Sequence, residues 1–365
     1  MGVNLGIVGL PNVGKSTLFN ALTCSQKAEA QNYPFCTIEP NAATVSVPDQ
    51  RLYDLAKLAG SQKIIPSFIE FVDIAGLVEG ASKGDGLGNK FLSHIRQVDA
   101  IVHMVRCFED QDVVHVRGNV DPLSDIEIIE TELVLADLES VEKRLANAQK
   151  KAKNNDPEAK ELLQVLQKVY PCLAQGSAAR TLLGTQDDAA VHALQLLSTK
   201  PILYVCNVSE QDALSGNKMT QEVSAFAAKS GAMALVISAK IEAEIAIIED
   251  VQERKDFLDA MGLEQSGMSK IIRACYSLLG LCSYFTIGPK EAHSWTFKTG
   301  ISAPQAAGII HSDFEKGFIC AEVISTADYL EYGSEAKLKE VGKVRLEGRE
   351  YKVCDADIIN FRFNV

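Results

Sequence analysis

A nine-residue stretch near the start of the chain has the residue types and spacing that bind a nucleoside triphosphate. It reads Gly9-Leu10-Pro11-Asn12-Val13-Gly14-Lys15-Ser16-Thr17, which fits G-x-x-x-x-G-K-[ST], and it follows the apolar run 5–8. Its glycines let backbone N–H groups face a phosphate, and a helix begins there with its positive dipole end. We expect Lys15 to reach the β- and γ-phosphates and Ser16 to bind Mg²⁺. Asn12, Val13, Gly14 and Thr17 are the other expected nucleotide contacts.

Two later segments have the features of loops that sense a bound nucleotide. The polar segment 31–40 contains Thr37, whose hydroxyl would complete the Mg²⁺ shell; the alternative is an ordinary loop threonine. A second segment, 67–76, is an apolar strand running into the D-x-x-G sequence that starts at Asp73. Asp73 would hold a metal-bound water, and Gly76 would donate its backbone N–H to the γ-phosphate. D-x-x-G alone is a weak signal, but its distance behind a phosphate loop makes it a strong one.

Two further strands lead to residues that could contact the base. Segment 201–206 precedes Asn207-Val208-Ser209-Glu210, and segment 234–237 precedes Ser238-Ala239-Lys240. GTP-binding proteins have N-K-x-D and S-A-K at these places. The N-K-x-D aspartate accepts two hydrogen bonds from guanine, and adenine lacks this two-donor edge. Here Glu210 replaces the aspartate and Val208 replaces the lysine, while Asn207 could bond either purine.

Without these two hydrogen bonds, the preference for guanine over adenine falls by a few kcal/mol. We therefore expect ATP to be accepted and preferred, with a GTPase of relaxed base choice as the alternative. Ser238 and Ala239 complete the expected base contacts.

The composition of the chain excludes several classes of protein. Its 365 residues are 47% apolar and 23% charged, which is typical of a soluble globular protein. No apolar run is long enough to span a membrane, and the nine cysteines include no C-x-x-C pair that would indicate zinc. We expect a protein of the reducing cytosol. The net charge of −12 argues against coating nucleic acid through bulk electrostatics.

The pattern of apolar residues divides the chain into three parts. Residues 1–125 and 199–280 read as an α/β nucleotide-binding domain. Residues 126–198 have helical periodicity broken at Asn154-Asn155-Asp156-Pro157, which predicts an antiparallel helical hairpin. Basic residues near its tip could meet a partner, although a solvated helix face is the simpler interpretation. Residues 281–365 predict a small mixed sheet with one helix at 303–311, which indicates an interaction module.

These motifs together resemble the YchF subfamily of Obg-like ATPases over essentially the whole chain. The resemblance is carried by the phosphate loop, Asp73–Val78, Gly84–Asn89, Asn207–Glu210 and the ending Asp357–Val365. It implies a P-loop domain of the GTPase type, a helical hairpin insertion, and a C-terminal TGS domain of β-grasp, ubiquitin-like fold. It also implies ATP hydrolysis in preference to GTP and binding to ribosomes or ribosomal subunits. The family commonly has methionine at the position of Val208, where the expected base contact is through the backbone.

The sequence contains more than one candidate for the group that orients the attacking water. Leu77 stands where many related switches have a glutamine, and its side chain cannot hydrogen-bond water. Hydrolysis is then slow and awaits a partner, or another polar group enters the site. His115 is the candidate, because it lies in the loop after a strand and the resemblance places a functional histidine there; His94 and His103 are the alternatives.

Two classes of function stay open. The first is an ATPase whose turnover is its output. The second is a nucleotide-gated binding module with negligible turnover, in which ATP arranges the loops around Thr37 and Gly76. Leu77 and the two appended modules favour the second class. We expect a monomer, since nothing in the sequence indicates a dimer.

Overall fold

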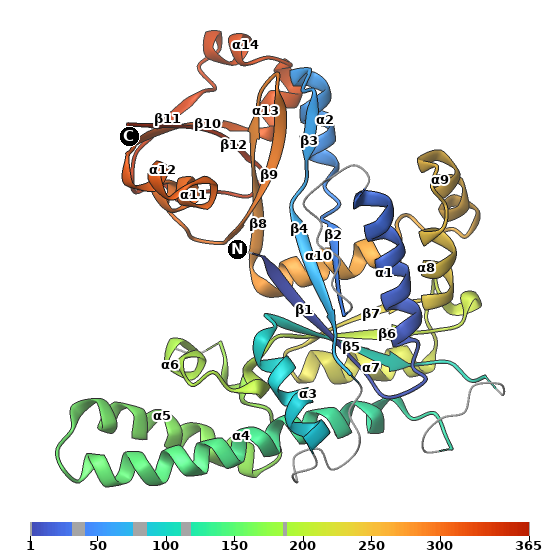
Figure 1. The fold of residues 1–365 in the computed structure, drawn as a ribbon, viewed down its shortest axis with the longest axis vertical. Helices are drawn as coiled ribbons and strands as arrows, with labels where there is room; N and C mark the ends of the chain where they lie inside the picture. The colour runs from blue at the N-terminus through green and yellow to red at the C-terminus, as the bar shows by residue number, and fades with distance from the viewer. Residues whose placement is uncertain (1, 31–40, 76–85, 111–117, 185–187, 365) are drawn as a thin grey trace. The chain divides into compact units, whose positions relative to one another are not determined.

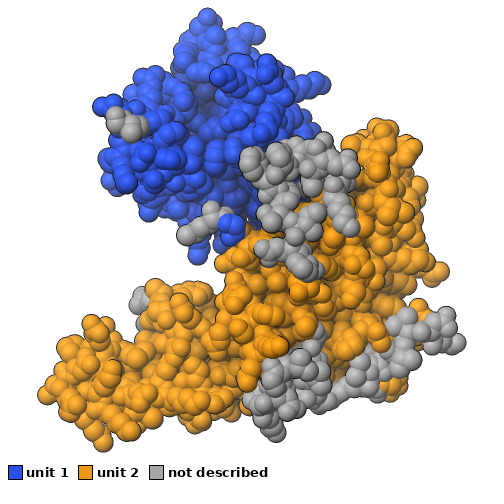
Figure 2. Space-filling view, in the orientation of Figure 1, with its two compact units in different colours: residues 1–2, 45–69, 272–365 blue, residues 3–44, 70–271 orange. Residues whose placement is uncertain are grey.

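The structure, a computed structural model, describes residues 2–30, 41–75, 86–110, 118–184 and 188–364. The chain forms two compact units, coloured separately in Figure 2. Unit 1 comprises residues 1–2, 45–69 and 272–365, and unit 2 comprises residues 3–44 and 70–271. The sequence analysis assigned residues 45–69 to the nucleotide-binding domain, whereas in the structure they pack within the C-terminal unit. The three-part division predicted from the sequence stays a prediction.

Unit 2 is built on a sheet with the strand order β2-β4-β1-β5-β6-β7. Its strands β1, β5, β6 and β7 pair in parallel. Every residue of β5 and of β6 is buried, as expected for central strands of a parallel sheet covered on both faces. Parallel strands place their carboxyl ends at one edge, which is where α/β sheets bind ligands. The bounds are β1 (Val3–Val8), β2 (Ala42–Ser46), β4 (Phe68–Asp73), β5 (Ala100–Arg106), β6 (Ile202–Asn207) and β7 (Met233–Ile237).

The helices of unit 2 connect and cover these strands (Figure 1). Buried side chains of β1, β5 and β6, including Val8, Ile101 and Tyr204, share one apolar cluster with Phe91 of α3 and Val223 of α7. The chain passes into unit 1 within α10. The bounds are α1 (Lys15–Ala30), α3 (Gly86–Gln97), α6 (Asp188–Ala193), α7 (Lys218–Lys229), α8 (Ala239–Ala246), α9 (Val251–Ala260) and α10 (Gly267–Leu279), with short 3-10 turns at Ala179–Leu182, Leu197–Thr199 and Glu210–Asp212.

Two long helices, α4 (Pro122–Ala152) and α5 (Pro157–Ala174), lie side by side within unit 2 (Figure 1). Asp156 is the residue directly before α5 and caps it by accepting a hydrogen bond from the N–H of Glu158 at 3.1 Å. Val141 of α4 packs with Leu166 and Val169 of α5 in a separate apolar cluster. Packing of this kind stabilises two helices that would be marginal alone. Within the described ranges, no helix is long and apolar enough to cross a membrane.

A buried polar network ties the base of this helix pair to strand β6. The Glu130 carboxylate forms an ion pair with Arg180 and accepts a hydrogen bond from the Tyr204 hydroxyl at 2.6 Å. Burial and the neighbouring carboxylate raise the pKa of Tyr204, so its hydroxyl stays protonated and donates. His103 lies beside it, with ring centroids 5.5 Å apart, and burial lowers the pKa of His103 to about 4. His103 is therefore a neutral core residue of β5.

Unit 1 contains a second sheet, with the order β11-β10-β12-β8-β9-β3. β8 pairs in parallel with β12 and antiparallel with β9, and β10 pairs antiparallel with both β12 and β11. Tyr284, Phe297 and Phe361 pack against α11, whereas Phe285 and Ile358 pack against α2. The bounds are β3 (Lys63–Ile65), β8 (Leu281–Ile287), β9 (Glu291–Lys298), β10 (Phe318–Ser325), β11 (Arg345–Glu347), β12 (Asp357–Phe363), α2 (Gln50–Ala59), α11 (Ala303–Ile310), α12 (Ser312–Lys316), α13 (Thr326–Tyr332) and α14 (Glu335–Glu340).

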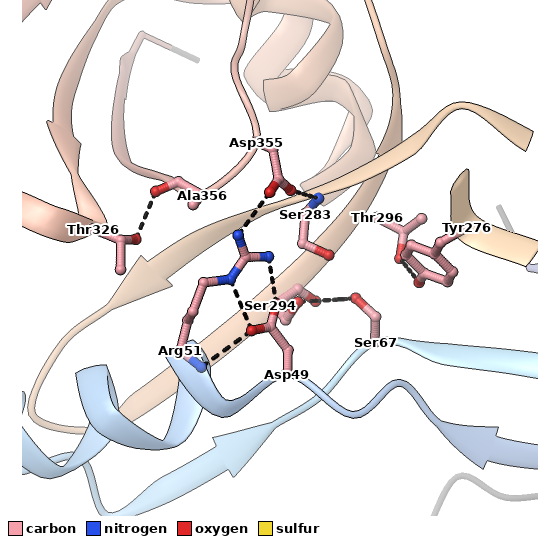
Figure 3. Close-up of polar contacts among 10 residues, drawn as sticks. All are labelled: Asp49, Arg51, Ser67, Tyr276, Ser283, Ser294, Thr296, Thr326, Asp355 and Ala356. Carbon is pink, nitrogen blue, oxygen red and sulfur yellow. Dashed lines mark hydrogen bonds and ion pairs between the residues drawn. The ribbon is translucent and has the colours of Figure 1, made fainter. Parts of the chain in front are cut away.

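Residues 45–69 belong to unit 1 because strand pairing and a polar cluster hold them there (Figure 3). β3 pairs in parallel with β9, from Lys63 opposite Glu291 onward. Arg51 donates to Asp49 at 2.7 and 2.8 Å and to Asp355 at 2.6 Å. The hydrogen bonds with Asp49 are the main cause of the raised pKa of Arg51. Because Arg51 joins an aspartate of its own segment to one near the C-terminus, it acts as a clamp within this unit.

Candidate functional site

The predicted phosphate loop connects β1 to α1 and has the backbone that an anion site needs. Asn12 and Gly14 have φ values of 64° and 94°, in the left-handed region. Gly14 has no room for a side chain, because a Cβ there would lie 2.3 Å from Nδ2 of Asn207. α1 begins at Lys15 with no acidic residue in its first turn. The positive end of the helix dipole therefore points at the loop without being neutralised.

The structure brings Lys15 and Asp73 together. The Lys15 ammonium forms an ion pair with the Asp73 carboxylate at the end of β4. Backbone hydrogen bonds fix this end: the Asp73 N–H donates to the Asn41 carbonyl at 2.8 Å, and the Ile74 N–H donates to the Ile7 carbonyl at 3.1 Å. The phosphate-loop lysine therefore lies beside the D-x-x-G aspartate, although the two are 58 residues apart in sequence.

The oxygen donors at this place suit Mg²⁺. Ser16 is exposed at the start of α1, and Asp73 adds a carboxylate at the end of β4. In the part of the chain that the structure describes, no group of three or more His, Cys, Asp or Glu residues could hold a metal. Mg²⁺ bound together with a nucleotide is commonly held by one or two protein oxygens along with phosphate oxygens and water.

Asn207 connects the phosphate loop to the predicted base-contacting segment. Its buried amide donates from Nδ2 to the Val13 carbonyl at 2.9 Å and accepts at Oδ1 from the Ala239 N–H at 2.8 Å. The sequence analysis expected this amide to contact the purine. The contacts present go to the protein backbone, so Asn207 positions the loop, and its contact with a base stays a prediction.

The other residues expected at the base lie on the loops after β6 and β7. Val208 is buried and donates its N–H to the Ile237 carbonyl at 2.9 Å. Ser238 is buried at the residue before α8, and Ala239 begins that helix. Glu210 forms an ion pair with Lys240 at 2.8 Å, and this hydrogen bond raises the pKa of Lys240. The Glu210–Lys240 pair was not predicted from the sequence, because no local spacing indicates it.

Thr37, Gly76 and His115 lie outside the described residues, so their expected roles stay predictions. The two alternative histidines are placed. His94 is exposed near the end of α3, and His103 is buried in β5. Burial excludes His103 from orienting a water at the phosphates, since its side chain is only 1% exposed.

Comparison with known proteins identifies the family. A family profile described as a 50S ribosome-binding GTPase matches residues 4–136, and a profile for the C-terminal part of YchF GTPases, described as a protein of unknown function, matches residues 281–364. The ribosome-binding ATPase YchF of Bacillus subtilis is 53% identical over 368 residues and is aligned over 100% of both chains. The chain belongs to the YchF family.

Further relatives agree with this assignment. The ribosome-binding ATPase YchF of Haemophilus influenzae is 52% identical over 366 residues, again over 100% of both chains. The solved structure of the Schizosaccharomyces pombe YchF GTPase has a TM-score of 0.88 at 37% identity and covers 99% of this chain and 98% of that one. The resemblance to YchF proteins and the P-loop GTPase type of the nucleotide-binding domain, both expected from the sequence, are confirmed.

Proposed function

We propose that this YchF-family protein binds and hydrolyses ATP with Mg²⁺ and uses the nucleotide to control binding to ribosomes. The observation that carries the proposal is the Lys15–Asp73 ion pair beside a glycine loop at the start of α1. It puts a cation and a carboxylate where phosphates and Mg²⁺ are bound in P-loop enzymes. Relatives of the same length are named ribosome-binding ATPases. A cytosolic location follows from that partner.

The preference for ATP rests on the Glu210–Lys240 ion pair. In accepting hydrogen bonds from guanine, the Glu210 carboxylate would have to share its oxygens with Lys240, whose ammonium lies 2.8 Å from one of them. Guanine binding would therefore weaken a contact that adenine binding leaves intact. A GTPase with relaxed base choice is the second candidate, since one matching family profile is described as a GTPase.

The catalytic water would be oriented by a group outside the described residues. We assign this role to His115, because it follows β5 in the sequence and the resemblance to YchF proteins places a functional histidine there. His94, which is exposed on α3, is the alternative, whereas His103 is buried. We assign Thr37 to the Mg²⁺ shell and Gly76 to the γ-phosphate on the same basis as in the sequence analysis. Ser16 would bind the metal, and Asp73 would hold a metal-bound water.

The C-terminal unit is proposed to be a TGS domain of β-grasp fold. Its order β9-β8-β12-β10-β11, with β8 and β12 parallel and α11 against one face, supports this assignment. Together with the tip of the helix pair α4 and α5, it is the proposed contact surface for the ribosome. The protein is proposed to act as a monomer.

Sedimentation with purified ribosomes tests the switch. We expect the full chain to pellet with ribosomes in a non-hydrolysable ATP analogue and to stay in the supernatant in ADP, because only the triphosphate can order loops through its γ-phosphate. The same samples give ATP turnover with and without ribosomes. Strong stimulation of ATP turnover by ribosomes would identify an ATPase driven by its partner. Nucleotide-dependent pelleting without such stimulation would identify a gated binding module. Equal pelleting in every nucleotide state would contradict the proposal.

A further inference from the structure

The sheet of unit 1 is split between β8 and β12. β8 pairs with β9 at every position from Leu281 to Ile287, and β12 pairs with β10 along most of its length. Between β8 and β12, in contrast, only Phe285 and Ile358 are in register. In Figure 1, β8 and β9 run nearly vertically, whereas β10, β11 and β12 run across the view. The Ala356 N–H also donates to the Ser283 carbonyl at 2.8 Å, so the two strands adjoin from Ser283 to Phe285. Beyond that, β8 ends at Ile287 whereas β12 continues to Phe363.

Because β8 ends first, the last residues of β12 have no neighbouring strand on that side among the described residues. The Asn364 N–H donates to the Gly317 carbonyl at 2.9 Å, so the backbone of Asn364 faces the β10 side. Backbone groups alternate in direction along a strand, so those of Phe361 and Phe363 face the opposite side, toward β8. β8 is no longer paired there. An unpaired edge of this kind is a template for an added strand.

A cavity of about 550 Å³ occupies the split, which we call the notch. Its wall includes Trp295 of β9, Phe314 of α12, and Phe361 and Phe363 of β12. Trp295 is held in place by a hydrogen bond from Nε1 to the Thr286 hydroxyl at 2.9 Å. Phe314 and Phe363 stack with centroids 3.7 Å apart. The notch therefore has rigid aromatic walls beside a strand edge, and it is large enough for the side chains of a short extended segment.

The charged groups at the notch are acidic. Glu291, Glu322 and Glu335 line it, and the described lining contains no lysine or arginine. Arg362 and Lys339 form ion pairs with Glu322 and Glu335. Glu291 is exposed and has no ion pair among the described residues. His293, which stacks on Trp295, is neutral at pH 7 because burial lowers its pKa to about 4. Glu291, opposite Lys63 in the β3–β9 pairing, is therefore the lining carboxylate that a lysine or arginine of a ligand would reach.

We propose that the notch between β8 and β12 binds an extended basic peptide segment of a protein partner, which adds a strand to the free edge of β12. Backbone hydrogen bonds to Phe361 and Phe363 hold the segment, alternate aliphatic side chains contact Trp295, and a lysine or arginine reaches Glu291. This interaction goes beyond the proposed ATPase function and does not depend on it. The test below distinguishes binding of a peptide in the notch from binding of a nucleic acid there.

Trp295 makes the test direct, because it is the only tryptophan in the chain. The full-length protein is titrated with an eight-residue peptide of alternating Lys and Val, and tryptophan fluorescence is recorded. Three further probes are the peptide with Glu in place of Lys, the Lys peptide N-methylated at every second backbone nitrogen, and a single-stranded RNA oligonucleotide. We expect a saturable change with the Lys peptide, and binding roughly tenfold or more weaker for the N-methylated peptide, because it loses backbone hydrogen bonds.

Two matched charge-reversal variants test whether the charge of Glu291 affects peptide binding. Glu291→Lys is expected to weaken binding of the Lys peptide severalfold by placing a like charge at the notch. Glu350→Lys makes the same change at an exposed residue of unit 1 outside the lining and is expected to leave binding unchanged. The proposal is overturned if the Lys and Glu peptides bind equally, if N-methylation has no effect, if Glu291→Lys binds like the parent, or if RNA binds in place of the peptide.

Discussion

Replacing Lys15 with methionine is expected to lower the rate of ATP hydrolysis by roughly 10²–10³-fold, the size of effect seen when one group that stabilises transition-state charge is removed. Methionine keeps an unbranched stem but removes the cation that pairs with Asp73. The Asp73 carboxylate would then stand beside the phosphates without compensation, and binding of the triphosphate would weaken as well. Phosphate release at saturating Mg²⁺ and ATP measures the effect.

The control for this variant is Lys143→Met. Lys143 is exposed on α4 and pairs with Glu139 one helical turn away. An exposed ion pair of this kind contributes little because solvent screens it, so stability and turnover should stay close to those of the parent. If Lys15→Met hydrolysed ATP at the parental rate, the phosphate loop would not be the catalytic centre.

Replacing Asn207 with alanine is expected to weaken ATP binding strongly and to lower the free energy of unfolding. The substitution leaves the Val13 carbonyl and the Ala239 N–H without their partner in a buried place. Each buried unsatisfied group costs about 1–3 kcal/mol, so for two groups we expect a loss of about 2–6 kcal/mol. Urea unfolding gives the stability, and titration with a fluorescent ATP analogue gives the affinity.

The variant Asn154→Ala serves as the comparison, because Asn154 is exposed at the turn between α4 and α5. It should bind ATP like the parent. Unchanged ATP affinity in Asn207→Ala would show that this amide does not position the phosphate loop.

The phosphate end of the site was predictable because its signals are local. A strand, a glycine turn, Lys15 and a helix follow one another directly, so the sequence pattern specifies their arrangement. The helix pair α4 and α5 was predictable for the same reason, since helical periodicity and the Asp156 cap lie within the segment. The place of Asp73 near the phosphate loop was expected from the distance between D-x-x-G and that loop in the sequence.

The role of residues 45–69 was not predictable, because it depends on partners far away in sequence. β3 has only three residues and pairs with β9 more than 200 residues later. Arg51 donates a hydrogen bond to Asp355, which comes 304 residues later in the sequence. No periodicity or spacing within one sequence indicates such a choice of partner, and strand pairing over this distance is decided by the whole fold.

At the end of the site that would contact the base, the sequence identified the candidate residues but did not predict their contacts. The sequence predicts Asn207 as a polar group at the end of a strand, but the backbone groups that its amide meets are brought there by folding. Glu210 was identified as the departure from the guanine-binding pattern. Its pairing with Lys240 became apparent only in the structure, and it adds a physical reason for the expected base preference.

Equilibrium affinity for ATP and GTP with Mg²⁺ measures whether the residue at position 210 makes the protein prefer ATP. The parent is compared with Glu210→Asp, while the buried Val208 is left in place, and Glu249→Asp is an exposed control. We predict that the parent binds ATP at least severalfold more tightly than GTP and that Glu210→Asp shifts the ratio toward GTP. Tighter binding of GTP by the parent, or a ratio that Glu210→Asp leaves unchanged, would contradict this role of Glu210.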